Sequence, residues 1–258
     1  MSELWNRINE LKPKSDVEWD EFKKSDFFYK IAMYNPKTNG VRYLKMMLYN
    51  LAMSLKDSEF DVLANIKNRN LGNPFSVKIN NHQIDLDYLS CVYEIMTLKK
   101  NLKNVNLKVL EIGSGYGRTC HSVISNFDVV SYTILDLDTM LEISKKYLKE
   151  VLSFDDYSKI EFVPVSDFTF SENFDLAIQI DGFNEMDELD VLEYLNYISN
   201  YCNSFYTKNP VGKYKDKELD DHWSGQDVVD LAMGSGIMVD VLNDIHNNNL
   251  VEEYSKAF

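Results

Sequence analysis

Three glycines at alternating positions, Gly113, Gly115 and Gly117, follow a short apolar segment at 107–112. The bulky and β-branched residues of that segment are typical of a strand buried on both faces of a parallel sheet. The glycines allow the backbone to turn tightly into a helix and leave room beside the main chain. Amide N–H groups and the positive end of the following helix favour a polar or anionic group there. The stretch therefore predicts a strand-to-helix turn that binds a ligand, with a turn that binds nothing as the alternative.

The spacing of these glycines separates two classes of ligand site. A dinucleotide fingerprint has its third glycine three residues after the second, and this chain has Arg118 at that position. The spacing therefore disfavours an NAD-dependent dehydrogenase. With Glu111 at the strand end, the pattern E-x-G-x-G-x-G resembles the first motif of class I S-adenosylmethionine-dependent methyltransferases. The resemblance implies that S-adenosylmethionine is the cofactor and that Glu111, the three glycines and Tyr116 line its site, with Tyr116 covering the methionine part.

A carboxylate, Asp136, closes the next apolar segment and lies 19 residues after Gly117 (136 − 117). In nucleoside-binding α/β folds, an acid at the tip of the second strand can accept hydrogen bonds from the ribose hydroxyls. Hydrogen bonds to a charged acceptor of this kind contribute roughly 1.5–3 kcal/mol. We therefore predict that Asp136 lies at an exposed strand end and binds the ribose. A solvated loop acid is the alternative.

From residue 107 onward, strand and helix patterns alternate, which predicts an α/β fold with a parallel sheet and right-handed crossovers. The expected strands are 107–112, 129–135, 160–164, 174–180 and 203–207, and the expected helices are 117–126, 139–152, 187–201 and 225–234. Two β-rich segments at 236–245 and 250–258, joined by asparagines, predict a C-terminal antiparallel hairpin. Five parallel strands closed by this hairpin resemble the Rossmann-like sheet of class I methyltransferases.

Residues 1–105 show helical periods and little strand signal, so we expect a mostly helical N-terminal extension ahead of an S-adenosylmethionine-binding domain at 106–258. Such an extension acts as a lid or as an interface, and its helical content indicates a possible homodimer. The segment 41–56 is apolar on one broad side, which predicts burial against the main domain or a second subunit. The alternation at 75–84, around two asparagines, fits a small hairpin or an extended connector.

The composition argues against several kinds of partner. The chain has 27 Lys and Arg against 41 Asp and Glu, a net charge of −14 without a basic stripe, so we expect no nucleic acid partner. The first residues lack the order of a signal peptide, and no apolar run approaches the ~20 residues of a membrane span. We expect a cytoplasmic protein without membrane insertion. Cys91, Cys120 and Cys202 are far apart in the sequence and fit reduced core thiols.

The fourth expected strand ends in the sequence DGFNEM at 181–186. Roughly residues 107–210 resemble bacterial sugar O-methyltransferases of surface-polysaccharide clusters. The resemblance rests on this F-x-E-M block, on the earlier V-L-E-I-G-x-G-Y-G-R and on a tyrosine-rich helix that follows. The resemblance implies that the acceptor is a hydroxyl of a sugar or nucleotide sugar used in capsule or lipopolysaccharide biosynthesis. Asn184 stands where that family usually has glutamine, so no role is transferred to it.

Methyl transfer to a hydroxyl needs an aligned acceptor oxygen and a base that removes its proton. The candidate bases are Asp181 and Glu185 at the end of the fourth strand, and His222 in an aspartate-rich loop after the fifth. Each has a plainer interpretation: a cap for Asp181, an ion pair with a lysine for Glu185, and an exposed loop histidine for His222. The resemblance also implies that Asp167 meets the adenine amine, with a helix cap as the alternative.

Two further possibilities concern metal and function. Asp181, Glu185, Asp187 and His222 could hold Mg²⁺, which prefers oxygen ligands, but the sequence has no dedicated metal motif and we expect no required metal. The acceptor could instead be an amine, a phosphate-linked group or another small molecule. The chain could also be a catalytically inactive nucleoside-binding module, which would bind the cofactor without turnover.

Overall fold

A computed structural model of the chain describes residues 15–25, 40–102, 106–169, 171–183, 186 and 188–209. The chain divides into two compact units, Met1–Met96 and Thr97–Phe258. The predicted helix at 225–234 and the predicted C-terminal hairpin lie outside the described residues. Glu185 and His222, two of the candidate bases, also lie outside them.

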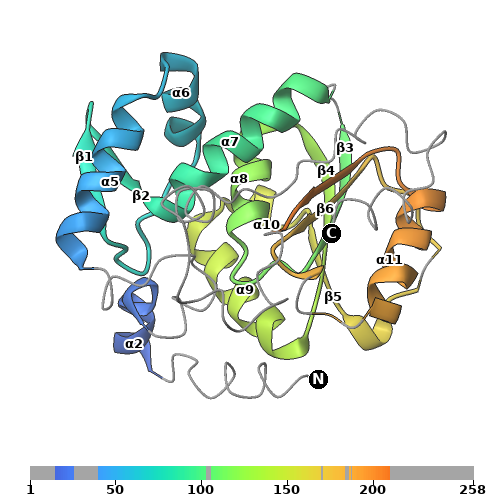
Figure 1. Ribbon diagram of the computed structural model, residues 1–258. Coiled ribbons are helices and arrows are strands. Elements are labelled where there is room, and N and C mark those ends of the chain that lie inside the picture. Colours follow the sequence, from blue (N-terminus) through green and yellow to red (C-terminus); the bar gives the residue numbers. More distant parts are fainter. Residues whose placement is uncertain are drawn as a thin grey trace, which may run out of the picture. The chain divides into compact units, whose positions relative to one another are not determined.

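Five parallel strands form the sheet of the second unit (Figure 1). The strands are β3 (Leu107–Ile112), β4 (Val129–Asp136), β5 (Ile160–Pro164), β6 (Leu176–Ile180) and β7 (Phe205–Lys208). Their order is β5-β4-β3-β6-β7, so the chain starts in the middle, moves outward to β5 and then returns to the other side of β3. This doubly wound order confirms the predicted Rossmann-like α/β sheet for these strands. In such a sheet, a ligand binds beyond the carboxyl ends of the strands, where the order reverses beside β3.

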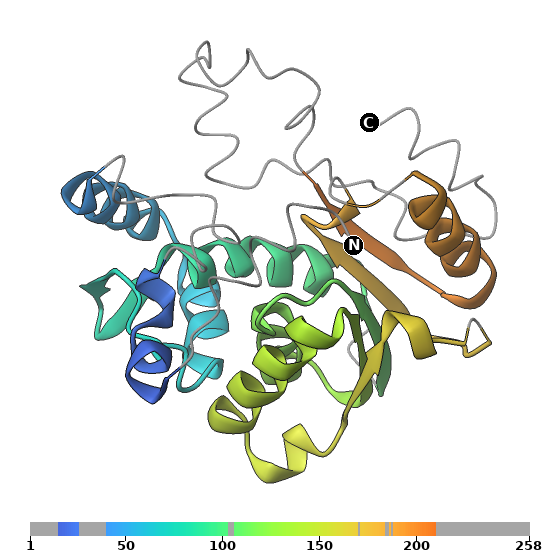
Figure 2. The ribbon, with the colours of Figure 1, turned by 90° about the horizontal axis from the view of Figure 1, so that it is seen from below.

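Helices cover both faces of this sheet. α8 (Arg118–Asn126) and α9 (Asp138–Val151) lie on one face and α11 (Glu188–Tyr201) lies on the other (Figures 1 and 2). A one-turn helix, α10 (Phe154–Tyr157), precedes β5. On the α11 face, buried apolar side chains of strands and helix form one core cluster, which includes Leu110, Ile112, Leu135, Ala177, Phe205, Val191, Leu195 and Ile198. Burial on both faces explains why β3, β4 and β6 appear in the sequence as nearly continuous apolar runs.

The first unit is mostly helical in its described residues and also contains an antiparallel hairpin. Its elements are α2 (Asp16–Asp20), η1 (Phe22–Lys24), α5 (Val41–Met53), α6 (Asp57–Asn65), β1 (Ser76–Ile79), β2 (His82–Asp85) and most of α7 (Leu86–Asn101). The hairpin turn consists of Asn80 and Asn81, both with left-handed backbone (φ of 48° and 64°), as a two-residue turn requires. Of the two interpretations of this segment, the hairpin is therefore confirmed.

Helix α5 has one buried face and one exposed face. Leu44, Leu48 and Ala52 are buried, and the helix packs on the β1–β2 hairpin of the same unit. The opposite face exposes Tyr43, Met46, Tyr49 and Met53. The apolar side predicted for 41–56 is buried at Leu44 and Leu48 and partly buried at Met47, Leu51 and Leu55, and in the described residues the helix packs on the hairpin of its own unit. None of the helices in the described part of the chain is both long and apolar enough to cross a membrane.

Candidate functional site

The glycine loop, residues 113–117, joins the end of β3 to the start of α8. Gly113, Gly115 and Gly117 have φ values of 76°, 57° and 96°, a left-handed backbone that favours glycine at each position. The loop is tied to the sheet because the Gly113 N–H donates to the Leu135 carbonyl at 2.9 Å. The left-handed conformation of the loop therefore accounts for glycine at these three alternating positions, whether or not a ligand binds.

Gly117 also packs closely against α9. A Cβ atom at this position would lie 2.9 Å from Cδ1 and Cγ of Leu148, closer than real Cβ contacts. The glycine loop therefore rests directly on the helix that follows β4.

Gly117→Ala is expected to lower the free energy of unfolding by about 1–3 kcal/mol, because alanine adds both backbone strain and a clash with Leu148. Urea denaturation would measure the loss. Gly40→Ala is a matched control, since Gly40 also has a positive φ of 83° but a Cβ there would lie 3.6 Å from Tyr43, an ordinary contact. Equal losses in the two variants would show that the Leu148 contact does not constrain the loop.

Asp136, the last residue of β4, is bonded to the glycine loop. Its Oδ2 accepts hydrogen bonds from Ser114 Oγ at 3.2 Å and from the Gly115 N–H at 3.1 Å, and its Oδ1 accepts one from the Leu137 N–H at 2.8 Å. The prediction of an exposed strand end is wrong, because the residue is only 8% exposed. A carboxylate offers about four acceptor positions, so these internal bonds occupy most of them, and the Ser114 N–H also supports the charged form.

The environment of Asp136 disfavours its charged form. Burial raises the pKa of Asp136 to about 6, while the hydrogen bonds from Leu137, Ser114 and Gly115 act in the opposite direction. Hydrogen bonds from ribose hydroxyls to this carboxylate would further favour the charged form.

Glu111 lies in the interior of the sheet, next to the glycine loop in sequence. It is 2% exposed, and its Oε2 accepts a hydrogen bond of 2.8 Å from the hydroxyl of Tyr132 on β4. Burial raises the pKa of Glu111 to about 7, against the lowering effects of the Tyr132 hydrogen bond and the Arg118 charge. Its carboxyl group thus joins β3 to β4 beneath the loop.

Tyr116 was expected to cover part of a ligand, but its ring is directed into the protein. The side chain is 4% exposed and packs edge-on against Tyr147 of α9, with ring centroids 4.8 Å apart. The ring therefore supports the loop from inside, and that expectation is wrong for this arrangement. Only its backbone can face a ligand without a movement of the ring.

Two other predicted acids lie at the carboxyl ends of strands on either side of the β3–β4 pair. Asp181 follows β6, is partly exposed and has a left-handed backbone with φ of 55°. Asp167 is exposed at the end of a short 3₁₀ turn, η2 (Val165–Asp167), that follows β5, and its Oδ1 accepts a hydrogen bond of 2.8 Å from Ser166. Because parallel strands end at the same edge, Asp136, Asp167 and Asp181 lie along one edge of the sheet.

The structure adds apolar residues to this edge that the sequence did not single out. Val163, Phe168 and Met186 are partly buried and pack on the core cluster that contains Phe183 and Tyr194. The phenol of Tyr194 is electrostatically coupled to the edge: burial, and then the charges of Asp190, Glu193 and Asp136, raise its pKa to about 12. The tyrosine-rich helix signalled this position, but its place in the core cluster depends on the packing of α11.

No group of three or more His, Cys, Asp or Glu side chains in the described ranges is arranged to hold a metal ion. Three of the four side chains considered for Mg²⁺, those of Glu185, Asp187 and His222, lie outside these ranges. Asp181 is the only described member of that set.

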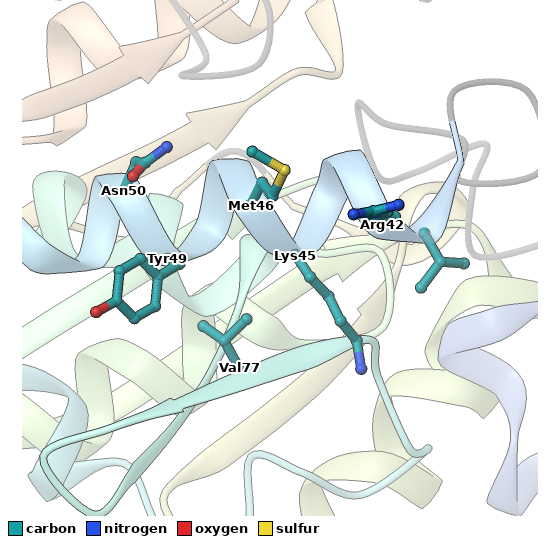
Figure 3. A pocket seen from close by; sticks show the side chains of 7 residues that line it. Arg42, Lys45, Met46, Tyr49, Asn50 and Val77 are labelled. Atoms are coloured by element: carbon teal, nitrogen blue, oxygen red, sulfur yellow. The ribbon is translucent and has the colours of Figure 1, made fainter.

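An open pocket of 560 Å³ lies in the first unit (Figure 3). Its lining residues come from α5 and β1: Val41, Arg42, Lys45, Met46, Tyr49, Asn50 and Val77. None of them is a carboxylate or a histidine. The pocket therefore contains none of the side chains predicted as the general base, Asp181, Glu185 and His222.

Comparison with known proteins finds solved structures that are similar to this chain. No protein-family model and no curated protein matches the chain. The methyltransferase domain of bacterial CtHen1 is 20% identical, with a TM-score of 0.42, over 55% of this chain and 84% of that structure. Thermoplasma acidophilum protein 1320 is 15% identical, with a TM-score of 0.40, over 58% of this chain and 69% of that one. The glycopeptide N-methyltransferase MtfA, in complex with S-adenosylmethionine, is 21% identical, with a TM-score of 0.38, over 46% of this chain and 54% of that one.

Proposed function

We propose that the chain is an S-adenosylmethionine-dependent methyltransferase. The observation that carries the proposal is the glycine loop between β3 and α8, whose three glycines are left-handed and whose Gly115 amide is bonded to Asp136. The loop lies where the strand order reverses, which is where ligands bind in doubly wound sheets. A nucleoside ligand fits this edge because the Asp136 carboxylate is held beside the glycine loop, whose main chain has no side chains to block a ligand.

The charge of the edge favours S-adenosylmethionine over NAD. Asp136 ends β4, Asp167 follows β5 and Asp181 follows β6, so all three lie at the carboxyl edge of one parallel sheet. The sulfonium and the ammonium of S-adenosylmethionine are positive and would be stabilised by carboxylates, whereas the diphosphate of NAD is negative and would be repelled. The position of Arg118, where a dinucleotide site needs glycine, supports the same choice.

Several residues are assigned to the cofactor in this proposal. The Asp136 carboxylate would bind a ribose hydroxyl, and the backbone at Gly113 and Gly115 would lie beside the methionine part. Asp167 would meet the adenine amine, while the partly buried side chains of Val163 and Phe168 supply an apolar surface for the ring.

The acceptor in this proposal is a hydroxyl of a sugar or nucleotide sugar used in a bacterial capsule or lipopolysaccharide. The bound cofactor would supply a methyl group that is transferred in line to the acceptor oxygen. The chain would hold that oxygen in place and take up the hydroxyl proton, steps that contribute through positioning and general base catalysis. Asp181 is the candidate base among the described residues, because it is partly exposed at the end of β6. Glu185 and His222 remain candidates.

Calorimetric titration of cofactor-free protein with S-adenosylhomocysteine, with NAD as the control ligand, tests the proposal. We expect micromolar binding of S-adenosylhomocysteine, on the order of −8 kcal/mol, and no binding of NAD. Binding of NAD alone, or of neither compound, would contradict it.

Incubation with S-adenosylmethionine and a panel of nucleotide sugars then tests the acceptor. Methylated sugar together with S-adenosylhomocysteine is the expected product pair. Methylation of amines or other small molecules only would replace the sugar assignment, and cofactor binding without turnover by any acceptor would favour an inactive nucleoside-binding module.

A further inference from the structure

A buried polar cluster lies beneath the turn that follows β6. It consists of Gln179 on β6, Thr207 on β7 and Asn209, which follows β7. Gln179 and Asn209 are fully buried at 0% exposure, and Thr207 is nearly so. The Thr207 hydroxyl lies 3.1 Å from the Gln179 amide and 2.9 Å from the Asn209 amide, and the two amides are 2.5 Å apart. A buried amide costs free energy unless its donors and acceptor are all bonded, so this cluster specifies one arrangement.

The Gln179 side chain is also bonded to the turn above it. With its amide oxygen toward the turn, that oxygen accepts hydrogen bonds from the Gly182 N–H at 2.6 Å and the Phe183 N–H at 2.8 Å. The amide nitrogen then faces Thr207 Oγ1 at 3.1 Å. The amide oxygen is then bonded to the turn and the amide nitrogen to Thr207. Because two NH₂ groups cannot bond at 2.5 Å, the Asn209 amide must present its oxygen to the Gln179 nitrogen in this orientation. Gln179 therefore links the turn to the neighbouring strand.

The turn has little freedom to adopt another shape. Asp181 has a positive φ of 55°, and its N–H donates to the Lys208 carbonyl at 2.8 Å, which extends the pairing of β6 with β7. A Cβ at Gly182 would lie 2.8 Å from the end of the Gln179 amide that faces the turn, so the amide occupies the space beneath this glycine. A strained residue such as Asp181 persists only where its surroundings determine it.

The turn also connects to the glycine loop through Met186. The Met186 N–H donates to the Phe183 carbonyl at 3.3 Å. The Met186 Cε lies 3.6 Å from the position of a Gly182 Cβ and 4.0 Å from that of a Gly113 Cβ. Met186 therefore lies between the turn and the first glycine of the loop.

We propose that Gln179 is a positioning residue that fixes the Asp181–Phe183 turn, holds Met186 beside Gly113, and thereby sets how long a ligand stays bound at the glycine loop. The part that concerns the ligand rests on the proposed function. The part that concerns the turn stands on the hydrogen bonds alone. Gln179 touches neither cofactor nor acceptor in this proposal, since it lies fully buried beneath the turn.

Three variants separate this role from general stability. Gln179→Met keeps the length of the side chain but removes the acceptor for Gly182 and Phe183. Gln179→Glu keeps two oxygens that can accept from the turn and from Thr207. Thr207→Val is the matched control, because it removes a hydrogen bond of the same buried cluster without touching the turn. If Gln179→Met does not fold, Gly182→Ala replaces it, since the added Cβ would displace the amide.

Amide hydrogen exchange of Gly182 and Phe183 in the ligand-free protein tests the turn. We expect exchange at least about tenfold faster in Gln179→Met, the effect of losing ~1.4 kcal/mol of hydrogen bonding, and near wild-type rates in Gln179→Glu and Thr207→Val. Unchanged exchange in Gln179→Met would overturn the proposal whether or not the protein binds a cofactor.

The dissociation rate of S-adenosylhomocysteine tests the consequence for the ligand. We expect release roughly tenfold faster in Gln179→Met and within about threefold of wild type in the other two variants. If ligand release were accelerated equally in Gln179→Met and Thr207→Val, the cluster would affect the ligand only through general stability. That result would overturn the role of Gln179 in binding. Absence of binding in the wild type would instead refute the proposed function, and the exchange rates would then decide the positioning role by themselves.

Discussion

Asp136→Asn is expected to weaken the binding of S-adenosylhomocysteine by about 10- to 150-fold, which corresponds to the roughly 1.5–3 kcal/mol of a hydrogen bond to a charged acceptor. The carboxylate of Asp136 accepts bonds from Ser114, Gly115 and Leu137. An amide has one acceptor oxygen, so its NH₂ group would face an N–H or O–H donor of the loop. The variant would therefore lose the ribose contact and also a hydrogen bond that fixes the shape of the glycine loop. Calorimetric titration at about pH 8, where the wild-type carboxylate is charged, measures the loss.

Asp138→Asn is the matched control for this prediction. Asp138 is two positions further along the chain, exposed in the first turn of α9, and carries the same charge. Its replacement removes a charge near the site without removing a contact of the loop, so we expect a change in affinity below about threefold, as for a screened surface charge. Similar losses in both variants would mean that Asp136 acts only through its charge. Unchanged affinity in Asp136→Asn would refute the assignment of the ribose to this residue.

The order and boundaries of the central elements could be predicted from the sequence because they depend on local patterns. The strands β3, β4 and β6 are mostly buried and give nearly continuous apolar runs, and the left-handed glycines mark the turn into α8. The hairpin of the first unit was predictable in the same way, since asparagine tolerates the left-handed backbone that its turn needs.

The direction of individual side chains could not be predicted in this way. The burial of Asp136 results from contacts with residues 21 and 22 positions earlier, and no local pattern encodes those contacts. Tyr116 has a favourable position in the motif, but the packing of α9 against the loop decides that its ring turns inward to Tyr147. Residues close to the glycine motif in sequence do lie in the same region of the fold. Their position in the sequence does not say which way each side chain points or what it does.

Gln179 illustrates a second limit. Within the apolar strand β6 it is a single polar residue, and a single polar residue in a strand more often faces solvent than the core. Its importance depends on partners from β7 and from the following turn, which are brought together only when β6 and β7 pair. The sequence contained a signal, a glutamine in an otherwise apolar run, but its interpretation needed the register of the two strands.

Glu111→Gln is expected to stabilise the protein at alkaline pH and to have almost no effect at acidic pH. Burial raises the pKa of Glu111 from 4.5 to about 7, so the folded state holds its proton more tightly than the unfolded state does. Its contribution to stability is therefore fully present below about pH 4.5 and is lost as the pH rises through about 7. Glutamine mimics the protonated side chain and can still accept the hydrogen bond from Tyr132. The variant should gain roughly 3 kcal/mol in free energy of unfolding at about pH 8, where a shift of one pKa unit corresponds to about 1.4 kcal/mol.

Urea denaturation of the wild type and the variant at several pH values between about 4 and 8 measures this difference. Asp136 also has a raised pKa, of about 6, and its charge raises the pKa of Glu111, so the measured difference includes the repulsion between the two carboxylates. Tyr132→Phe is the opposing control: it removes the hydroxyl that donates to Glu111 and should destabilise the protein more at alkaline than at acidic pH, because the hydrogen bond supports the charged form. A stability difference between Glu111→Gln and wild type that did not change with pH would show that Glu111 keeps an ordinary pKa. The carboxyl group would then have to reach solvent or a cation near the glycine loop, which would return it to the surface of the proposed cofactor site.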